Sequence, residues 1–399
     1  MSKVSTMSAT PPIQLPATFA YGTPAEVVFG NGASKIAGER VAALGARTAL
    51  LIADRGVFAA GLAQPVEQLL AAAGVRCETF DQVAGEPTDR SVQAAVERVL
   101  EVRPDALVGM GGGSAMDTAK AAAVVAENGG TVRDYLNRQR PITRPGVPVV
   151  AIPTTAGTGA EVTRVSVIID VDRQYKGGIS GPLLLPRLAI CDPELTLGLP
   201  ATVTANSGID ALTHCVECYA NTVFSPYAKL LALEGVRVIG GALRRAVAHG
   251  GDLATRWQML WGANLGGLCI DRAGTGDVHA LAGPVSGMFG VPHGRANAIL
   301  LPHVMAFSLP AALDAYADVA AALGEPVAGL SRVQAGERGV EAVRRLIADC
   351  GGPLRLSECG VREEHLEALT RDGFGRGTRA TNPRIASRDD VAAIYRAAL

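Results

Sequence analysis

The first 200 residues alternate short apolar runs with longer amphipathic stretches, and this alternation constrains the fold more than any other feature of the chain. Runs rich in Val, Ile and Leu, bounded by Gly, Pro or Asp, predict buried strands at 47–54, 105–113 and 147–155. Between them, segments such as 62–74 and 88–102 place apolar residues three and four apart, as helices do. Strand, helix and strand in succession predict a parallel sheet with helices on its faces.

The pattern changes after Pro200. Apolar residues follow helical spacing over 226–251 and 253–270, so we expect the second half to be all helical. Ser387 followed by Asp390 is typical of the N-cap of a last helix. The chain is therefore expected to form two domains.

The predicted boundaries place a flexible, proline-containing tail at 1–16, an α/β domain at 17–199 and a helical domain at 200–399. Ligands of parallel sheets bind at the carboxyl ends of the strands. We therefore expect the functional site in the cleft between the two domains.

Composition limits the partners and the compartment. Lys and Arg number 37 against 38 Asp and Glu, so the totals provide no basic face for nucleic acid or an anionic membrane. The seven cysteines lack regular spacing, and the N-terminus lacks the apolar core of a signal peptide. The sequence contains no uninterrupted stretch of about 18 apolar residues, so we expect no membrane span. We expect a cytoplasmic protein with a small-molecule substrate, whose low charge fits a homodimer or larger homo-oligomer.

A glycine-rich turn follows the second predicted strand and opens a helix. Its residues Gly112, Gly113 and Ser114 let the backbone approach a ligand closely, and free amides at a helix start attract phosphate. The turn is therefore a candidate cradle for a pyrophosphate, although it matches neither GxGxxG nor a P-loop. The alternative is a tight turn without a ligand.

A second loop, at 153–163, follows the third predicted strand with threonines and glycines that can bind phosphate or ribose. Asp54 ends the first strand, where a carboxylate would accept hydrogen bonds from the ribose diol of a dinucleotide. It would repel a 2′-phosphate, so the sequence favours NAD over NADP. The alternative is that Asp54 only caps the following turn.

Histidines and one carboxylate form a candidate metal site. Asp210 and His214 are four residues apart in a helical stretch and share one face. His279 and His293 lie farther along, among small residues. One carboxylate and three imidazoles suit Fe²⁺ or Zn²⁺. The alternatives are an ordinary helix pair and two satisfied core or loop histidines.

Cys215 and Cys218 form a CxxC directly after His214. No second cysteine pair completes a tetrahedral set, so we interpret them as packing residues of an amphipathic helix, with thiol redox chemistry as the alternative.

Six ordered motifs resemble the iron-dependent, or group III, alcohol dehydrogenase family, within the fold shared with dehydroquinate synthase and glycerol dehydrogenase. They are GMGGGSAMDTAK at 109–120, IPTTAGTGAEVTR at 152–164, CDPELT at 191–196, GIDALTHCVECY at 208–219, VPHGRANAILLPHV at 291–304 and NPRIASRDDV at 382–391. The resemblance implies an α/β dinucleotide-binding domain followed by an all-helical metal-binding domain, and a metal-dependent oxidoreductase that exchanges hydride between NAD(H) and an alcohol or aldehyde.

The resemblance also implies roles for individual residues. The implied metal ligands and catalytic residues, for Fe²⁺ with Zn²⁺ as a substitute, are Asp210, His214, His279 and His293. The implied cofactor contacts are Asp54, Gly112, Gly113, Ser114, Asp117, Thr154, Thr155, Thr158, Thr163 and Lys176.

The chain also departs from the family pattern. Gly283 stands four residues after the first loop ligand, where the family commonly carries a second histidine that assists proton transfer, so we expect a larger pocket and a different proton route. Arg272 and Asp277 stand where small or apolar residues are typical, and Glu86 replaces a frequent asparagine. A more polar pocket favours a semialdehyde, hydroxyacid or phosphonate-bearing aldehyde, with Arg272 as the partner of its anionic group.

Three other functions stay open at this point. A sugar-phosphate cyclase or lyase of the dehydroquinate synthase kind would use NAD without net turnover. A maleylacetate reductase is a near relative, and a nucleotide-binding regulator with an inactive site would fit the loss of the second histidine at Gly283.

Overall fold

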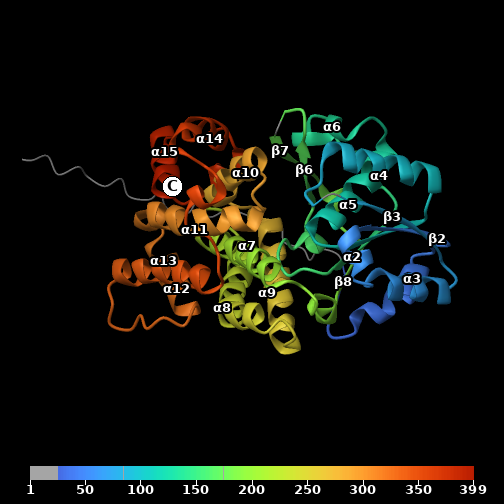
Figure 1. Ribbon diagram of the computed structural model, residues 1–399, viewed down its shortest axis with the longest axis horizontal. Coiled ribbons are helices and arrows are strands. Elements are labelled where there is room, and N and C mark those ends of the chain that lie inside the picture. The colour runs from blue at the N-terminus through green and yellow to red at the C-terminus, as the bar shows by residue number, and fades with distance from the viewer. Residues whose placement is uncertain (1–25, 84, 174) are drawn as a thin grey trace, which may run out of the picture.

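The computed structural model describes residues 26–83, 85–173 and 175–399. Figure 1 shows the α/β part at one end of an elongated molecule and the helical part at the other. The tail predicted at 1–16 lies outside the described residues. No helix among the described residues is long and apolar enough to cross a bilayer.

All strands lie in the first half of the chain. They are β1 (Glu26–Phe29), β2 (Thr48–Asp54), β3 (Arg76–Val83), β4 (Ala106–Gly111), β5 (Val149–Pro153), β6 (Val165–Asp170), β7 (Tyr175–Ser180) and β8 (Leu188–Cys191). Six of them form a parallel sheet in the order β1-β8-β5-β4-β2-β3. The antiparallel hairpin β6-β7 stands apart from this sheet and was not predicted.

The helices of the α/β part are α1 (Ala37–Ala43), α2 (Arg55–Ala59), α3 (Ala63–Ala72), α4 (Asp89–Val102), α5 (Gly113–Asn128) and α6 (Val132–Tyr135). Those of the helical part are α7 (Ala201–Ala220), α8 (Pro226–Ala248), α9 (Leu253–Ala273), α10 (Asp277–Phe289), α11 (His293–Ser308), α12 (Leu313–Ala322), α13 (Arg332–Asp349), α14 (Leu366–Phe374) and α15 (Arg388–Ala397). The predicted N-cap of the last helix is confirmed, because Ser387 and Asp390 form a capping box.

The central strands are buried on both faces, as the unbroken apolar runs predicted. In β2, Leu50 and Ile52 pack into a core shared with α4 and α5. The intervening Leu51 and Ala53 pack into a core shared with α1 and α3. Successive side chains of a strand point to opposite faces, so one continuous apolar run supplies both cores.

The carboxyl ends of β2, β4 and β5 lie together at one edge of the sheet. Register pairs Ala53 with Met110 and Gly111 with Pro153, so the segments that begin at Asp54, Gly112 and Thr154 emerge side by side. This is the edge at which ligands of parallel sheets bind.

The loop after β5 packs directly on the helical part. A Cβ on Gly157 would come within 2.8 Å of the Ser207 side chain on α7, and one on Gly159 within 2.3 Å of the Gly267 Cα on α9. Gly159 has a φ of 62°, which disfavours any side chain there. Glycine is therefore required where the two parts meet.

A similar close approach sets α11 against α7. A Cβ on Gly294 would lie 2.0 Å from the main-chain oxygen of Asn206 and 3.3 Å from the Cβ of Asp210. Because both neighbours belong to packed helices, the contact fixes the start of α11, including His293, relative to Asp210.

We expect Gly294→Ala to lower the free energy of unfolding by about 1–3 kcal/mol, because the added methyl overpacks this contact. Gly241→Ala is the matched control, since its Cβ meets no atom within 4 Å in the interior of α8 and should be neutral or slightly stabilising. Denaturant unfolding of both variants measures the difference. Equal stability of the two variants would contradict the packing argument.

Candidate metal and cofactor site

Three helices bring the four predicted metal ligands together. Asp210 and His214 lie one turn apart in the middle of α7, His279 lies in the first turn of α10, and His293 begins α11. The Nε2 atoms of His214, His279 and His293 lie 3.9, 3.7 and 4.0 Å from Oδ1 of Asp210. Ligand atoms of Asp210, His279 and His293 all lie within 4.8 Å of one another. The His214 ring stacks on the His279 ring, with centroids 4.7 Å apart.

Burial and mutual charge shape the electrostatics of this cluster. Burial by itself would raise the pKa of Asp210, but the charge of His214 and the hydrogen bond of His279 hold that pKa well below its usual range. Burial lowers the pKa of His214 to about 4. For His293, burial followed by the charge of Lys176 lowers the pKa well below the usual value. The site therefore presents an anionic carboxylate with neutral imidazoles at positions 214 and 293. Burial disfavours the charge of His279, but the carboxylates of Glu217 and Asp210 raise its pKa to about 9, so this ring must lose a proton when a metal binds.

Two further polar residues hold this cluster and were missed by the sequence analysis. Glu217, one turn after His214, has Oε2 2.5 Å from Nδ1 of His279, while its Oε1 accepts from the main-chain N–H of Val278 at 2.6 Å. Asn297 donates to Oδ1 of Asp210 at 2.7 Å. Their spacing from the ligands, three and four residues, was the available signal.

The buried Nδ1 atoms of His214 and His293 have no hydrogen-bond partner among the described residues. Glu217 engages Nδ1 of His279 and thus directs its Nε2 toward Asp210. The donor set and its geometry fit a divalent metal ion.

The two predicted phosphate loops lie against each other beside this cluster. Cβ atoms placed on Gly112 and Gly113 would approach Thr155 Oγ1 at 3.5 Å and Thr158 Cγ2 at 2.7 Å. Gly112 is the N-cap of α5 and provides no side-chain cap, so the first amides of the helix are left for a ligand. This cradle fits the phosphates of a dinucleotide.

The interpretation of Asp54 as a helix cap is confirmed, and its contact with a cofactor stays a prediction. Its Oδ1 accepts from the main-chain N–H of Val57 at 3.1 Å and so caps α2. Its Oδ2 faces the glycine-rich turn, 3.2 Å from where a Cβ on Gly111 would lie. Capping therefore leaves one carboxylate oxygen directed at the cradle.

Two predicted cofactor residues are engaged within the protein instead. The Asp117 carboxylate lies 2.8 Å from Nζ of Lys120 and accepts from the N–H of Val167 at 2.9 Å. Thr163 Oγ1 accepts from Nζ of Lys120 at 3.3 Å, and both residues are buried. Thr163 thus links the second loop to Lys120 on α5, and Asp117 links α5 to β6, while contact of these two side chains with a cofactor stays a prediction.

The other predicted cofactor residues contact neighbouring segments of the α/β part. Thr154 is buried, and its N–H donates to the main-chain oxygen of Gly111. Ser114 donates to the main-chain oxygen of Gly85 at 2.7 Å. Lys176, on β7, pairs with Glu86 at 2.7 Å.

The residues predicted to widen and polarise the substrate pocket are arranged differently. Asp277 is fully buried and pairs with Arg379 at 3.1 Å, so its carboxylate belongs to the interior and not to an open pocket. Arg272 lies 3.5 Å from Asp271, which itself binds Arg164.

The prediction of a larger pocket at Gly283 is wrong. A Cβ there would lie 2.8 Å from Nη1 of Arg376 and 3.0 Å from its Cζ, so a guanidinium fills the space.

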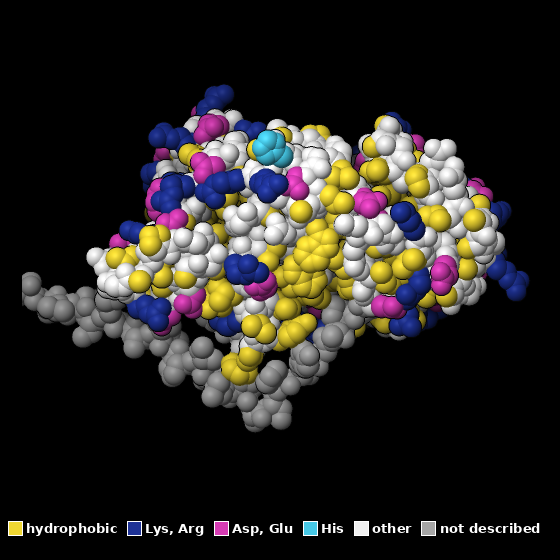
Figure 2. Space-filling view, turned by 90° about the horizontal axis from the view of Figure 1, so that it is seen from below, with side chains coloured by type: hydrophobic (Ala, Val, Ile, Leu, Met, Phe, Trp, Pro, Cys, Tyr) yellow, Lys and Arg dark blue, Asp and Glu magenta, His cyan; other side chains and the backbone are white. Residues whose placement is uncertain are grey.

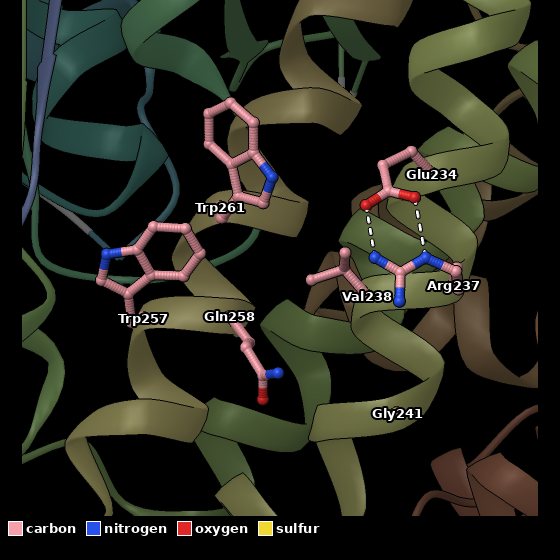
Figure 3. Close-up of a pocket in the computed structure, with 7 residues that line it drawn as sticks. All are labelled: Glu234, Arg237, Val238, Gly241, Trp257, Gln258 and Trp261. Carbon is pink, nitrogen blue, oxygen red and sulfur yellow. Dashed lines mark hydrogen bonds and ion pairs between the residues drawn. The ribbon is translucent and has the colours of Figure 1, made fainter.

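A different cavity, of about 350 Å³, lies between α8 and α9. Figure 3 shows Trp257 and Trp261 on one side of it and the ion pair of Glu234 and Arg237 on the other. It contains none of the predicted site residues. On the face shown in Figure 2, charged side chains of both signs are scattered and form no continuous basic area among the described residues.

The thiols form no disulfide: all seven cysteines are free. Cys215 and Cys218 are fully buried in α7, as expected of packing residues.

Comparison with known proteins places the chain among dehydrogenases over most of its length. Residues 24–193 match the model of the iron-containing alcohol dehydrogenases, and residues 204–399 match that of the C-terminal part of the Fe-containing alcohol dehydrogenase family. An NAD-dependent methanol dehydrogenase of Bacillus methanolicus is 38% identical over 376 residues, which are 94% of this chain and 98% of that protein.

Solved structures agree with the sequence matches. A 1,3-propanediol oxidoreductase has a TM-score of 0.92 and 36% identity, covering 96% of this chain and 100% of that one. A sulfoacetaldehyde reductase from Bifidobacterium kashiwanohense, in complex with NAD⁺, has a TM-score of 0.86 and 26% identity, covering 96% and 99%. On these matches and on the site described above, the chain belongs to the iron-containing alcohol dehydrogenase family.

Proposed function

We propose that this protein is an NAD(H)-linked, iron-dependent oxidoreductase that interconverts an alcohol and an aldehyde. The observation that carries the proposal is the convergence of three imidazoles on the carboxylate of Asp210, next to a glycine cradle at the start of α5. The first feature fits a metal that binds the substrate oxygen, and the second fits the phosphates of the cofactor.

The donor set determines which metals fit. One carboxylate and three imidazoles from Asp210, His214, His279 and His293 suit Fe²⁺, with Zn²⁺ as a substitute. When bound, such an ion polarises a carbonyl or alcohol oxygen, and nicotinamide supplies or accepts the hydride.

The chain's own residues bind and orient the reactants. Backbone amides at Gly113 and Ser114 would hold the pyrophosphate, and Thr155 and Thr158 would supply hydroxyl donors beside it. Asp210 and His214 are buried, which limits the access of water on their side of the cluster, whereas His279 and His293 are partly exposed. Position 283 carries no imidazole, so we expect the proton to pass through water, a ribose hydroxyl or the substrate itself.

The comparisons support this proposal. The relatives named above include an NAD-dependent methanol dehydrogenase and a sulfoacetaldehyde reductase with NAD⁺. The family match favours this function over the cyclase and regulator alternatives. We also propose that the protein is cytoplasmic and forms a homodimer or larger homo-oligomer, whose mass can be measured by light scattering. We place the boundary between its two domains near Pro200, the N-cap of α7.

Removal of the metal tests the proposal directly. We expect dialysis against a chelator to abolish oxidation of NADH with short aldehydes, and added Fe²⁺ to restore it, because the substrate oxygen depends on the ion. Absorbance of NADH and elemental analysis of the same samples measure both quantities. Activity that persists in metal-free protein would refute iron dependence.

Glu217→Gln is expected to weaken metal binding about 10–100-fold, because Nδ1 of His279 would lose the carboxylate that orients the ring. Competition with a chromophoric chelator measures the dissociation constant. Glu234→Gln is the control, since Glu234 pairs only with Arg237 on the surface of α8. Unchanged metal affinity in Glu217→Gln would remove the orienting role.

Asp54→Asn is expected to reduce the preference for NADH over NADPH about tenfold, because it removes the charge that repels a 2′-phosphate. An asparagine still caps α2, so the fold should be retained. Comparing kcat/KM for the two cofactors gives the ratio. A wild-type preference for NADPH would contradict this assignment of Asp54.

A further inference from the structure

Arg376 occupies the position that a side chain at residue 283 would fill. Gly283 follows His279 by four residues in α10, so both lie on the same face of the helix. A Cβ on Gly283 would lie 2.8 Å from Nη1 of Arg376, and 3.0 Å from its Cζ. Gly283 follows His279 by one helical turn, roughly 6 Å along the axis, so the guanidinium contacts the turn next to this metal ligand.

The opposite side of this guanidinium faces the α/β part. Nη1 of Arg376 donates to the main-chain oxygen of Lys176 at 2.7 Å, and its Cζ lies 4.7 Å from the centre of the Tyr175 ring. Arg376 thus lies between α10 and β7, against the helical turn that follows His279.

The hydrogen bonds of Arg376 leave part of its donor capacity unused. Nη2 donates to Asp372 at 2.9 Å, and Nη1 is used by Lys176, but the buried Nε has no partner among the described residues. The Asp372 side chain is 23% exposed and that of Arg376 is 11% exposed, so the pair is not sealed off. Five N–H donors in a planar fork match a carboxylate or a similar oxoanion better than any neutral group.

We propose that Arg376 binds an anionic group of the substrate, so that the enzyme acts on short aldehydes or alcohols that carry a carboxylate, sulfonate or phosphonate. This inference rests on the proposed alcohol–aldehyde activity. Because the guanidinium contacts α10 only one turn after His279, we expect only a few carbon atoms between the anion and the reacting carbon. Arg376 thereby takes over the place of a proton-transfer imidazole, but it binds substrate and moves no proton, because a guanidinium stays charged.

The test compares 4-oxobutanoate with its methyl ester, which has the same chain without the charge, and uses propanal as a small neutral reference. Wild-type enzyme should favour the anion at least tenfold in kcat/KM. Arg376→Gln should lower kcat/KM for 4-oxobutanoate about 10–100-fold, mainly through KM, because the contact exists in ground state and transition state alike. The ester and propanal should change less than about threefold.

Two further variants separate substrate binding from structure. Gly283→Ala should displace the guanidinium and reduce the preference for the anion in the same direction. Arg384→Gln is the matched control, because Arg384 also donates to a main-chain oxygen and covers an aromatic ring, that of Phe307, but at the exposed surface. It should keep the wild-type preference.

Several results would overturn the proposal. The first is an equal kcat/KM of the wild type for the acid and the ester. The second is an equal loss of kcat/KM for all substrates in Arg376→Gln, which would mean that Arg376 only links the two parts of the molecule. If the wild type reduces propanal in a metal-dependent way but shows no preference for the anionic aldehyde, this inference is refuted and the proposed function stands. Absence of metal-dependent NADH oxidation with every aldehyde refutes the proposed function beneath it. Sulfoacetaldehyde and phosphonoacetaldehyde, assayed in parallel, identify the preferred anion.

Discussion

The contact between Gly159 and Gly267 is the constraint on which the rest of the site depends. Backbone meets backbone there, and any side chain on Gly159 would overlap α9. The contact lets the loop after β5 lie directly on the helical part, while the same loop also covers the start of α5. Because one short loop touches both, the phosphate cradle and the metal-ligand helices are held at a fixed separation, as hydride transfer requires.

Buried charges fix this arrangement further. The ammonium of Lys120 is fully buried and binds the main-chain oxygen of Ala160 at 2.9 Å together with the Asp117 carboxylate. A buried charge is tolerated only when it is paired and hydrogen-bonded, so Lys120 holds α5 and the second loop in one geometry. Asp210 plays the equivalent part in the helical domain, where three imidazoles and Asn297 surround one carboxylate.

Local patterns predicted the central strands and the helical second half, but not every strand and not all of the side-chain roles. The strands at β2, β4 and β5 and the helical second half follow from periodicity, which depends only on neighbouring residues. The hairpin β6-β7 was missed, because it stands outside the main sheet and its second strand contains Gly177 and Gly178. Thr163 lies in the second predicted loop and Asp117 in the helix after the first, yet both side chains bind Lys120, and its link to Thr163 spans 43 residues.

The sequence by itself determined the fold class, the two glycine-rich loops and the four candidate ligands, since each depends on residue type and short spacing. Only the tertiary structure decided what surrounds them. Glu217 reaches His279 across 62 residues, and Arg376 reaches Gly283 from the segment after α14. Because glycine has no side chain, the sequence indicated an open pocket at Gly283, but the guanidinium of Arg376 fills that space. Packing between distant segments, which periodicity does not encode, determines whether such a site is empty, apolar or charged.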